Sequence, residues 1–481
     1  MDLYFVKRPL VERYSDVLPE GSAGAVSLLE RRVIPDGMPV VLGPDMRPVE
    51  PLSSWFRYLA YLGRDPETMR SYAYVVLRLA EFLAWRGRDV LTATESDLLA
   101  YRRQRLEVQS VPIDPVTTWD REASTVNGLF GWLAEAGHVR HRPLRMPKAY
   151  GSGLTQAMQV RHLVLEQYLF FRDVGMGGQR PDGEIDTAFR GGFPHRNRAA
   201  VELALMTGMR KREWSSVLLP ELSRRPGGPA GFVLQACAKY GRRRDVYVPA
   251  GPLDLVETYA LLERAEIVER SARRLARRHR ELFVVDSVDE GRGRLAGVLG
   301  GRRRVFDMAR MAAGLRRITV REGSGGLESM AVFLGQGGLM LSASSWDRIR
   351  RHAWQRMLAF ADFGQALVLP RKPYRYHDLR HTFALRLLKH LTRLVIEREQ
   401  RRADRRSLVS LAEHISMNPL LIVQRALGHA SPRTTYGYLA YLDDPMNYVD
   451  EAFRAWADSD GATYAEIAIR LLEGDRDGTQ G

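Results

Sequence analysis

Four short segments of the chain carry side chains that together could break a phosphodiester bond. In chain order, these side chains are Arg210, Glu213, Lys239, His377, Arg380, His429 and Tyr438. Cleavage of a phosphodiester without a metal requires a nucleophile, a proton donor for the leaving oxygen, and cations around the charge that develops at phosphorus. A tyrosine, a lysine or histidine, and a pair of arginines can fill these three roles.

The chemistry of each side chain suggests its role. Arg210 and Arg380 can hold nonbridging oxygens with paired N–H donors, as Mg²⁺ does in two-metal nucleases. His377 and His429 can donate hydrogen bonds or transfer protons. Lysine occurs at only six positions, against 66 arginines. Because lysine can release a proton where arginine cannot, Lys239 is the candidate general acid.

Each of these residues alone also has an ordinary structural interpretation. The chain contains 11 histidines and 19 tyrosines, and a single histidine or tyrosine more often packs or forms a hydrogen bond than catalyses a reaction. Glu213 would ordinarily be a salt-bridge partner, and Arg380 a surface cation. Tyr436 is a second candidate nucleophile, two residues before Tyr438. The residue types alone leave both tyrosines open.

The ordered set of motifs resembles the tyrosine recombinase, or phage integrase, family. The motifs are TGxRxxE, a lysine in a hairpin, HxLRHT and LGHxSxxTTxxY, spread between Thr207 and Tyr438. The resemblance implies that Tyr438 is the nucleophile, because it follows His429 by nine residues, and that Glu213 supports the first arginine. It further implies a 3′-phosphotyrosine intermediate that needs no metal or nucleotide cofactor. The catalytic set that it implies is Arg210, Lys239, His377, Arg380 and His429.

The composition is that of a globular chain with a polyanionic partner. The 481 residues are 45% hydrophobic and carry a formal net charge of +15. This excess of positive charge, with interleaved aromatic residues, favours nucleic acid as the partner. No apolar run of about 18 residues occurs, so we expect no membrane span and a cytoplasmic, nucleoid-associated protein. The single cysteine, Cys237, excludes an internal disulfide and thiolate zinc clusters.

Hydrophobic periodicity and capping residues predict a mainly α protein with a small β component, an α+β fold. Helices are expected from Asp65 to Gly87, from Thr94, and over 118–136, 160–174, 196–206, 263–282, 345–360, 378–391 and 419–427. Two β-rich runs in 231–250 predict a hairpin around Tyr240-Gly241. We expect an N-terminal extension (1–50), a helical SAM-like core-binding domain (51–145), a mixed catalytic domain (155–450) with insertions near 250–339 and 396–414, and an amphipathic tail (451–481).

The resemblance also implies binding partners, and two alternative functions stay open. It implies double-stranded DNA held in a C-shaped clamp, a homotetramer on two DNA sites, a tail that packs on a neighbouring protomer, and, as an option, an accessory DNA-bending protein. A type IB topoisomerase and a non-catalytic DNA-binding regulator are the alternatives, while a metal-dependent transposase fits the residues less well. The basic residues that we expect at DNA are Arg102, Arg103, Arg145, Lys148, Arg242, Arg243 and Arg244.

Overall fold

The chain divides into two compact units, Met1–Ala157 and Met158–Gly481, each described below by itself. The computed structural model describes residues 1–7, 34–108, 118–152, 160–223, 230–361, 369–370, 372–403 and 418–441. The predicted tail at 451–481 and most of the expansion at 396–414 lie outside the described residues. Within the described part of the chain, the helices are too short or too polar to cross a membrane.

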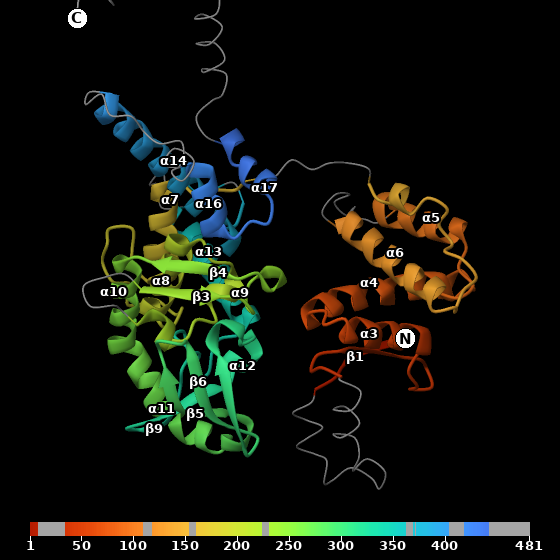
Figure 1. The fold of residues 1–481 in the computed structure, drawn as a ribbon, viewed down its shortest axis with the longest axis horizontal. Coiled ribbons are helices and arrows are strands. Elements are labelled where there is room, and N and C mark those ends of the chain that lie inside the picture. Colours follow the sequence, from red (N-terminus) through yellow and green to blue (C-terminus); the bar gives the residue numbers. More distant parts are fainter. Residues whose placement is uncertain are drawn as a thin grey trace, which may run out of the picture. The chain divides into compact units, whose positions relative to one another are not determined.

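The N-terminal unit is a bundle of helices with a two-stranded antiparallel sheet (Figure 1). Its elements are β1 (Asp2–Phe5), β2 (Pro39–Leu42), α3 (Glu50–Tyr61), α4 (Pro66–Trp85), α5 (Glu95–Arg103), a π-helical turn (Gln104–Val108), α6 (Asp120–Glu135) and a 3₁₀ turn (Pro147–Tyr150).

The helix starts of this unit follow the predicted capping chemistry. The Asp65 carboxylate accepts a hydrogen bond from the Glu67 N–H at 2.9 Å, directly before Pro66 in the first turn of α4. Thr94 and Asp97 form a capping box at the start of α5. These contacts satisfy amide groups that a helix N-terminus leaves without an intrahelical partner. The predicted helices at these positions are confirmed.

Two buried polar contacts attach the end of this unit to the bundle. The Trp119 indole donates to the Tyr150 carbonyl at 2.9 Å, and the Tyr150 hydroxyl donates to the Leu98 carbonyl at 3.0 Å. Tyr150 is almost completely buried. These contacts attach the segment around Tyr150 to the bundle, beyond residue 145, which we gave as the end of the core-binding domain.

The C-terminal unit is larger and contains helices, a β-hairpin and a separate sheet (Figure 1). Its α-helices are α7 (Leu165–Leu169), α8 (Pro194–Thr207), α9 (Lys211–Trp214), α10 (Ala250–Tyr259), α11 (Ala265–Ala276), α12 (Ala313–Arg317), α13 (Ala343–Ala361), α14 (Tyr376–Ala403), α16 (Pro419–Leu427) and α17 (Pro432–Tyr436). Its strands are β3 (Ala230–Leu234), β4 (Arg244–Val248), β5 (Phe283–Asp289), β6 (Arg294–Leu299), β7 (Arg302–Asp307), β8 (Thr319–Gly323) and β9 (Gly326–Ser329).

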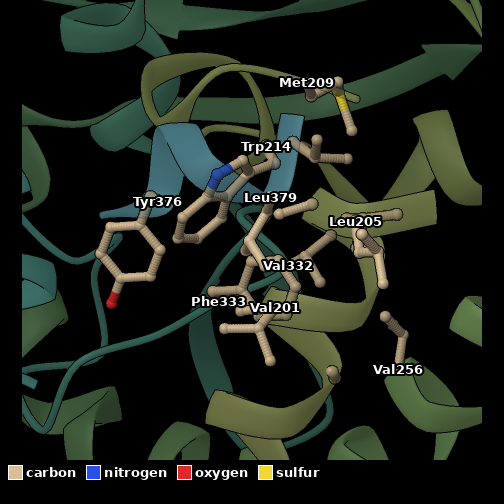
Figure 2. Close-up of a cluster of buried hydrophobic side chains, with 14 of the residues drawn as sticks. Val201, Leu205, Met209, Trp214, Val256, Val332, Phe333, Tyr376 and Leu379 are labelled. Carbon is tan, nitrogen blue, oxygen red and sulfur yellow. The ribbon is translucent and has the colours of Figure 1, made fainter. Parts of the chain in front are cut away.

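An aromatic cluster joins the helices that carry the motifs. The Trp214 ring on α9 meets the Trp346 ring on α13 edge-on, with centroids 4.8 Å apart, and meets the Tyr376 ring at the start of α14 at 5.3 Å. Figure 2 shows Trp214 and Tyr376 beside Leu379 and the apolar side chains of α8, including Val201. Because these large rings are buried together, α9 and the start of α14 occupy defined positions relative to each other.

The predicted hairpin forms, but with a longer connection than expected. Strands β3 and β4 pair in antiparallel register, from Ala230 opposite Val248 to Leu234 opposite Arg244. Tyr240-Gly241 is therefore not a tight turn between the strands. It lies in a connection of residues 235–243 that contains a 3₁₀ turn at Lys239–Gly241.

The expansion at 250–339 contains a five-stranded sheet that we did not expect. Its strand order is β7-β6-β5-β8-β9, and every neighbouring pair is antiparallel except β5 and β8, which are parallel. The predicted helical stretch at 263–282 is largely correct, since α11 and its flanking turns occupy it. The sheet escaped prediction because its strands are short and because the edge strand β7 begins with three exposed arginines, which give no apolar alternation.

A buried ion pair attaches this expansion to the rest of the unit. The Arg316 guanidinium on α12 binds both oxygens of the Glu221 carboxylate, at 2.6 and 2.8 Å, and both side chains are at most 1% exposed. Arg316 also donates to the Ser216 carbonyl at 3.1 Å. All these partners lie outside the expansion, so the pair joins segments about a hundred residues apart in the chain.

Removal of one partner of this pair should destabilise the unit strongly. Arg316→Met leaves the Glu221 carboxylate buried without its cation, and we expect a loss of about 3–5 kcal/mol in the free energy of unfolding. Arg303→Met is the matched control, because Arg303 pairs with Asp286 on the exposed sheet surface, and we expect a loss of about 0–1 kcal/mol. Urea unfolding of the full-length variants measures both. Equal losses would contradict the structural role of Arg316.

Candidate active site

The first motif places Arg210 through a glycine with a left-handed backbone. Helix α8 ends at Thr207, and Gly208 has a φ of +60°. A Cβ atom at Gly208 would lie 2.4 Å from the Phe383 ring on α14. Both the backbone conformation and the close packing therefore require glycine here. The chain then reverses into α9, with Arg210 at the position that caps it.

The Glu213 carboxylate is completely buried and holds two arginines. One oxygen accepts hydrogen bonds from the Arg210 backbone N–H, at 2.8 Å, and from the Arg244 guanidinium. The other accepts from the Arg210 guanidinium at 3.1 Å. Glu213 thus contacts Arg210, with Arg244 as an additional partner, and its supporting role in catalysis stays a prediction.

Arg244 does not lie at the surface where we expected it to bind DNA. Its side chain is 5% exposed, and besides Glu213 it donates to the Ala426 carbonyl at 2.5 Å. The adjacent Arg242 and Arg243 are exposed. Arg244 is the first residue of β4 and lies on the inward side of the strand with Val246 and Val248, because side chains alternate along a strand. Arg242 and Arg243 precede the strand, in the connection from β3.

Arg380 is positioned by two backbone carbonyls. Its guanidinium donates to the Gly208 carbonyl at 2.7 Å and to the Leu427 carbonyl at 2.6 Å, and the residue is 1% exposed. Burial, followed by the charges of Arg210 and Arg244, lowers the pKa of Arg380 to about 9. The guanidinium therefore remains charged at neutral pH. Because the dielectric constant around this buried group is low, its charge acts strongly on its neighbours.

The Tyr438 hydroxyl is hydrogen-bonded to a histidine that the sequence analysis did not select. It lies 3.0 Å from the Nδ1 atom of His381, one residue after Arg380 on α14. Tyr438 is 1% exposed, and burial raises its pKa to about 12 although Arg380 and Arg210 act in the opposite direction. The neighbouring candidate, Tyr436, is 53% exposed.

His429 lies on another side of the same tyrosine. Its ring is almost parallel to the Tyr438 ring, with centroids 6.1 Å apart, and its Nδ1 atom is 3.0 Å from the Thr435 hydroxyl. Burial and the charges of Arg380 and Arg210 lower the pKa of His429 to about 4. The ring is therefore neutral at physiological pH.

His377 and Lys239 occupy the exposed part of the site. The His377 ring meets the His381 ring edge-on at 4.7 Å. Desolvation, followed by the charges of Arg380, Arg210 and Lys239, lowers the pKa of His377 to about 4. Lys239 is exposed, in the connection between β3 and β4. The structure thus brings the seven candidate side chains close enough together for the charges of Arg210, Lys239 and Arg380 to act on the histidines and the tyrosine.

The sequence signal for His381 was present but not used. His381 belongs to the same HxLRHT motif as His377 and Arg380, but only its contact with Tyr438 distinguishes it from a structural histidine. Among the described residues, no group of three or more His, Cys, Asp or Glu side chains is arranged to hold a metal ion.

Comparison with known proteins identifies part of the N-terminal unit. Residues 52–137 match the family model described as phage integrase, N-terminal SAM-like domain. This part of the chain is similar to that domain. The match lies within the predicted core-binding segment, 51–145, and confirms the resemblance to phage integrases. A search of curated proteins gives no match to the sequence.

Several solved structures are similar to the chain at low sequence identity. They include the XerH site-specific recombinase bound to a palindromic difH substrate, with 14% identity and a TM-score of 0.46 over 93% of this chain and 94% of that chain. The integrase of the Tn1549 transposon in complex with transposon right end DNA has 11% identity and a TM-score of 0.43, over 86% of this chain and 99% of that chain. A lambda integrase tetramer bound to a Holliday junction has 13% sequence identity and a TM-score of 0.43, over 80% of this chain and 76% of that chain.

The predicted DNA-contact residues within and just after the SAM-like domain are mostly exposed. Arg103 is paired with Glu107 at 2.9 Å, and the Arg145 side chain is 89% exposed, at 3.4 Å from Glu95. Lys148 is also exposed, whereas Arg102 is half-buried. Their binding to DNA stays a prediction.

The buried histidines should make the stability of the protein depend on pH. Burial lowers the pKa of His381 to about 3 from 6.5, so the ring stays neutral in the folded state while it takes up a proton in the unfolded chain. The stability that His381 contributes is therefore fully present above pH about 6.5 and is lost as the pH falls toward the pKa of the folded state. We expect His381→Gln to reduce this slope between about pH 6.5 and 5, by up to about 1.4 kcal/mol per pH unit.

Thermal and urea unfolding across this pH range measure the effect. His279→Gln, a change at an exposed histidine on the surface of the same unit, is the control and should leave the slope unchanged. An identical slope for wild type and His381→Gln would contradict a neutral, buried His381.

Proposed function

We propose that the chain is a tyrosine-type site-specific DNA recombinase that breaks and rejoins DNA without a metal or nucleotide cofactor. The observation that carries this proposal is the Tyr438 hydroxyl, held by His381 at 3.0 Å within the field of Arg380 and Arg210. A nucleophile of this kind beside two fixed guanidinium groups suits attack on a phosphodiester. The SAM-like domain, matched over 52–137, supports DNA as the substrate.

In the proposed reaction, the Tyr438 hydroxyl loses its proton to water as its oxygen attacks the scissile phosphorus, and the bond from phosphorus to the 5′ oxygen breaks. The product is a 3′-phosphotyrosine and a free 5′ hydroxyl, whose proton comes from Lys239. Arg210 and Arg380 bind the nonbridging oxygens, where negative charge grows in the transition state. Attack of a 5′ hydroxyl on the phosphotyrosine reverses the steps and restores the phosphodiester, so no external energy source is needed.

His381 has a positioning role in this scheme. Because burial lowers its pKa to about 3, the ring is a weak base and does not retain the tyrosine proton. Its neutral Nδ1 atom can accept a hydrogen bond from the Tyr438 hydroxyl and so hold this side chain in place until DNA binds. His377 and His429, which are also neutral, can donate hydrogen bonds to phosphate oxygens.

Tyr438 must leave its buried position before it can attack DNA. In the free protein the side chain packs with Leu388, Val423 and Leu427, and this burial raises its pKa. When the side chain moves toward a bound phosphate, the burial contribution is removed, while the effect of Arg380 and Arg210 in lowering the pKa remains. DNA binding would therefore activate the tyrosine, and cleavage in the absence of correctly placed DNA would be suppressed.

The partners of the chain follow from this function. Double-stranded DNA carrying recombination sites is the substrate, and a homotetramer on two such sites is the proposed active assembly. An accessory DNA-bending protein remains part of the proposal. Among the basic residues expected at DNA, Arg242 and Arg243 are exposed beside Lys239 on the β3–β4 connection, which suits contact with phosphates near the site of cleavage.

Replacement of Tyr438 should abolish covalent attachment to DNA. With nicked suicide duplexes tiled across the DNA flanking the gene, the wild-type protein should give an SDS-resistant adduct, and Tyr438→Phe should give none while still binding DNA. Tyr436→Phe is the matched control and should retain the adduct. An adduct formed by Tyr438→Phe would overturn the nucleophile assignment, and tight binding without any wild-type adduct would favour a non-catalytic regulator.

DNA binding should also depend strongly on salt. If about 6 to 10 phosphates are neutralised, the affinity should fall by about 10³ to 10⁵ between about 50 and 200 mM salt. We expect Arg242→Ala and Arg243→Ala each to reduce the slope of log affinity against log salt concentration by about one. Arg270→Ala, on the exposed face of α11, removes the same charge and is the control. A slope that is flat in the wild type would contradict binding through phosphates.

A further inference from the structure

The C-terminal unit contains a large basic cavity at some distance in the sequence from the catalytic motifs. Its volume is about 900 Å³, which is in the range of sites for small molecules. Its walls come from α13, the ends of α11 and α12, and the loops around residues 189–193 and 335–342. None of the candidate catalytic residues lines it.

The charges of the cavity are all of one sign. Its described lining contains no aspartate or glutamate. Its cationic side chains are Arg190, Arg196, Arg274, Arg278, Arg317, Arg348 and Arg356. Arg356 is neutralised by Asp186 at 2.5 Å and Arg278 by Glu281 at 2.8 Å. Within the described part of the chain, the other five have no carboxylate within ion-pair distance.

Arg196 is the most informative of these cations because it is buried. It is 3% exposed, and among the described residues its guanidinium donates to neutral oxygens, at 2.8 Å to the Leu334 carbonyl and at 2.9 and 3.2 Å to the Asn197 amide. The nearby Glu263 carboxylate binds the backbone N–H groups of His195 and Arg196 at the start of α8. A buried cation without an ion-pair partner is costly, and an anion in the cavity would stabilise it.

The apolar part of the cavity would suit a ligand that also has a nonpolar portion. Met340, Leu341 and Ile349 line it together with Phe189 and Phe360. The two phenylalanine rings pack against the Arg356 guanidinium, at 5.2 and 4.8 Å, and so hold it in place. Arg274 and Arg317 come from the expansion at 250–339, so this cavity depends on a part of the chain outside the four catalytic motifs.

We propose that this cavity binds a small anion that carries two or more phosphate groups. Guanidinium groups match phosphate oxygens with paired N–H donors, and several of them converge on one volume that lacks any competing carboxylate in its described lining. A nucleoside triphosphate and an inorganic polyphosphate share this chemistry. The site is independent of the proposed recombinase chemistry, because it shares no residue with it.

Calorimetric titration of the full-length protein with ATP and, separately, with inorganic tripolyphosphate tests this proposal. The cavity variants are Arg274→Glu on α11 and Arg348→Glu on α13. Arg273→Glu and Arg351→Glu are matched controls, because they make the same charge change at exposed positions on the same helices outside the cavity. We expect the cavity variants to raise Kd by about tenfold or more, and the controls by about twofold or less.

The arms of the experiment separate the possible results. Tighter binding of ATP than of tripolyphosphate would indicate that the nucleoside contacts the apolar wall, and equal binding that only the phosphates are recognised; both support the site. Absence of binding to either probe would overturn the proposal. Equal effects of the cavity and control variants would also overturn the proposal, because they would show that the anions are attracted by the overall positive charge of the protein. Loss of duplex DNA affinity with unchanged anion binding would show a DNA surface instead.

Discussion

The buried Glu213 carboxylate is the interaction on which the candidate site depends. It is shielded from water and satisfied by Arg210 on one side and Arg244 on the other. Arg244 extends from β4 to the Ala426 carbonyl at the end of α16, so a single carboxylate connects three segments that are distant in the chain. Because a buried charge without its partners is strongly unfavourable, the native arrangement of these segments and the position of Arg210 are established together.

A second constraint is the opposition between burial and charge at Tyr438. The apolar pocket that holds the ring raises the pKa of its hydroxyl, whereas Arg380 and Arg210 lower it. The free protein therefore contains a protected tyrosine next to the groups that would assist its attack. The same burial keeps His381 and His429 neutral, so the site has arginines as its permanent cations and histidines as hydrogen-bonding groups.

The parts that the sequence predicted are those with local signals. Capping residues such as Asp65 and Thr94 predicted helix starts that the structure shows. The ordered motifs selected Arg210, His377, Arg380, His429 and Tyr438, whose catalytic roles stay predictions. The sheet of β5 to β9 was not predicted, because its strands are short and the arginines of the edge strand β7 resemble solvated surface. The contact of His381 with Tyr438 and the burial of Arg244 depend on packing between distant segments, for which spacing in one sequence carries no information.

The central claim, that this group of side chains directs Tyr438 onto a DNA phosphate, is tested most directly by locating the covalent bond. The adduct of the wild-type protein with a cleaved duplex can be digested with nuclease and trypsin, and the peptide that begins at Thr434 sequenced by tandem mass spectrometry. This peptide, 434–454, contains both candidate nucleophiles, Tyr436 and Tyr438, together with Tyr441 and Tyr448, so all four tyrosines are compared in one molecule. We expect the nucleotide on Tyr438. A nucleotide on any of the other three tyrosines would contradict the assignment.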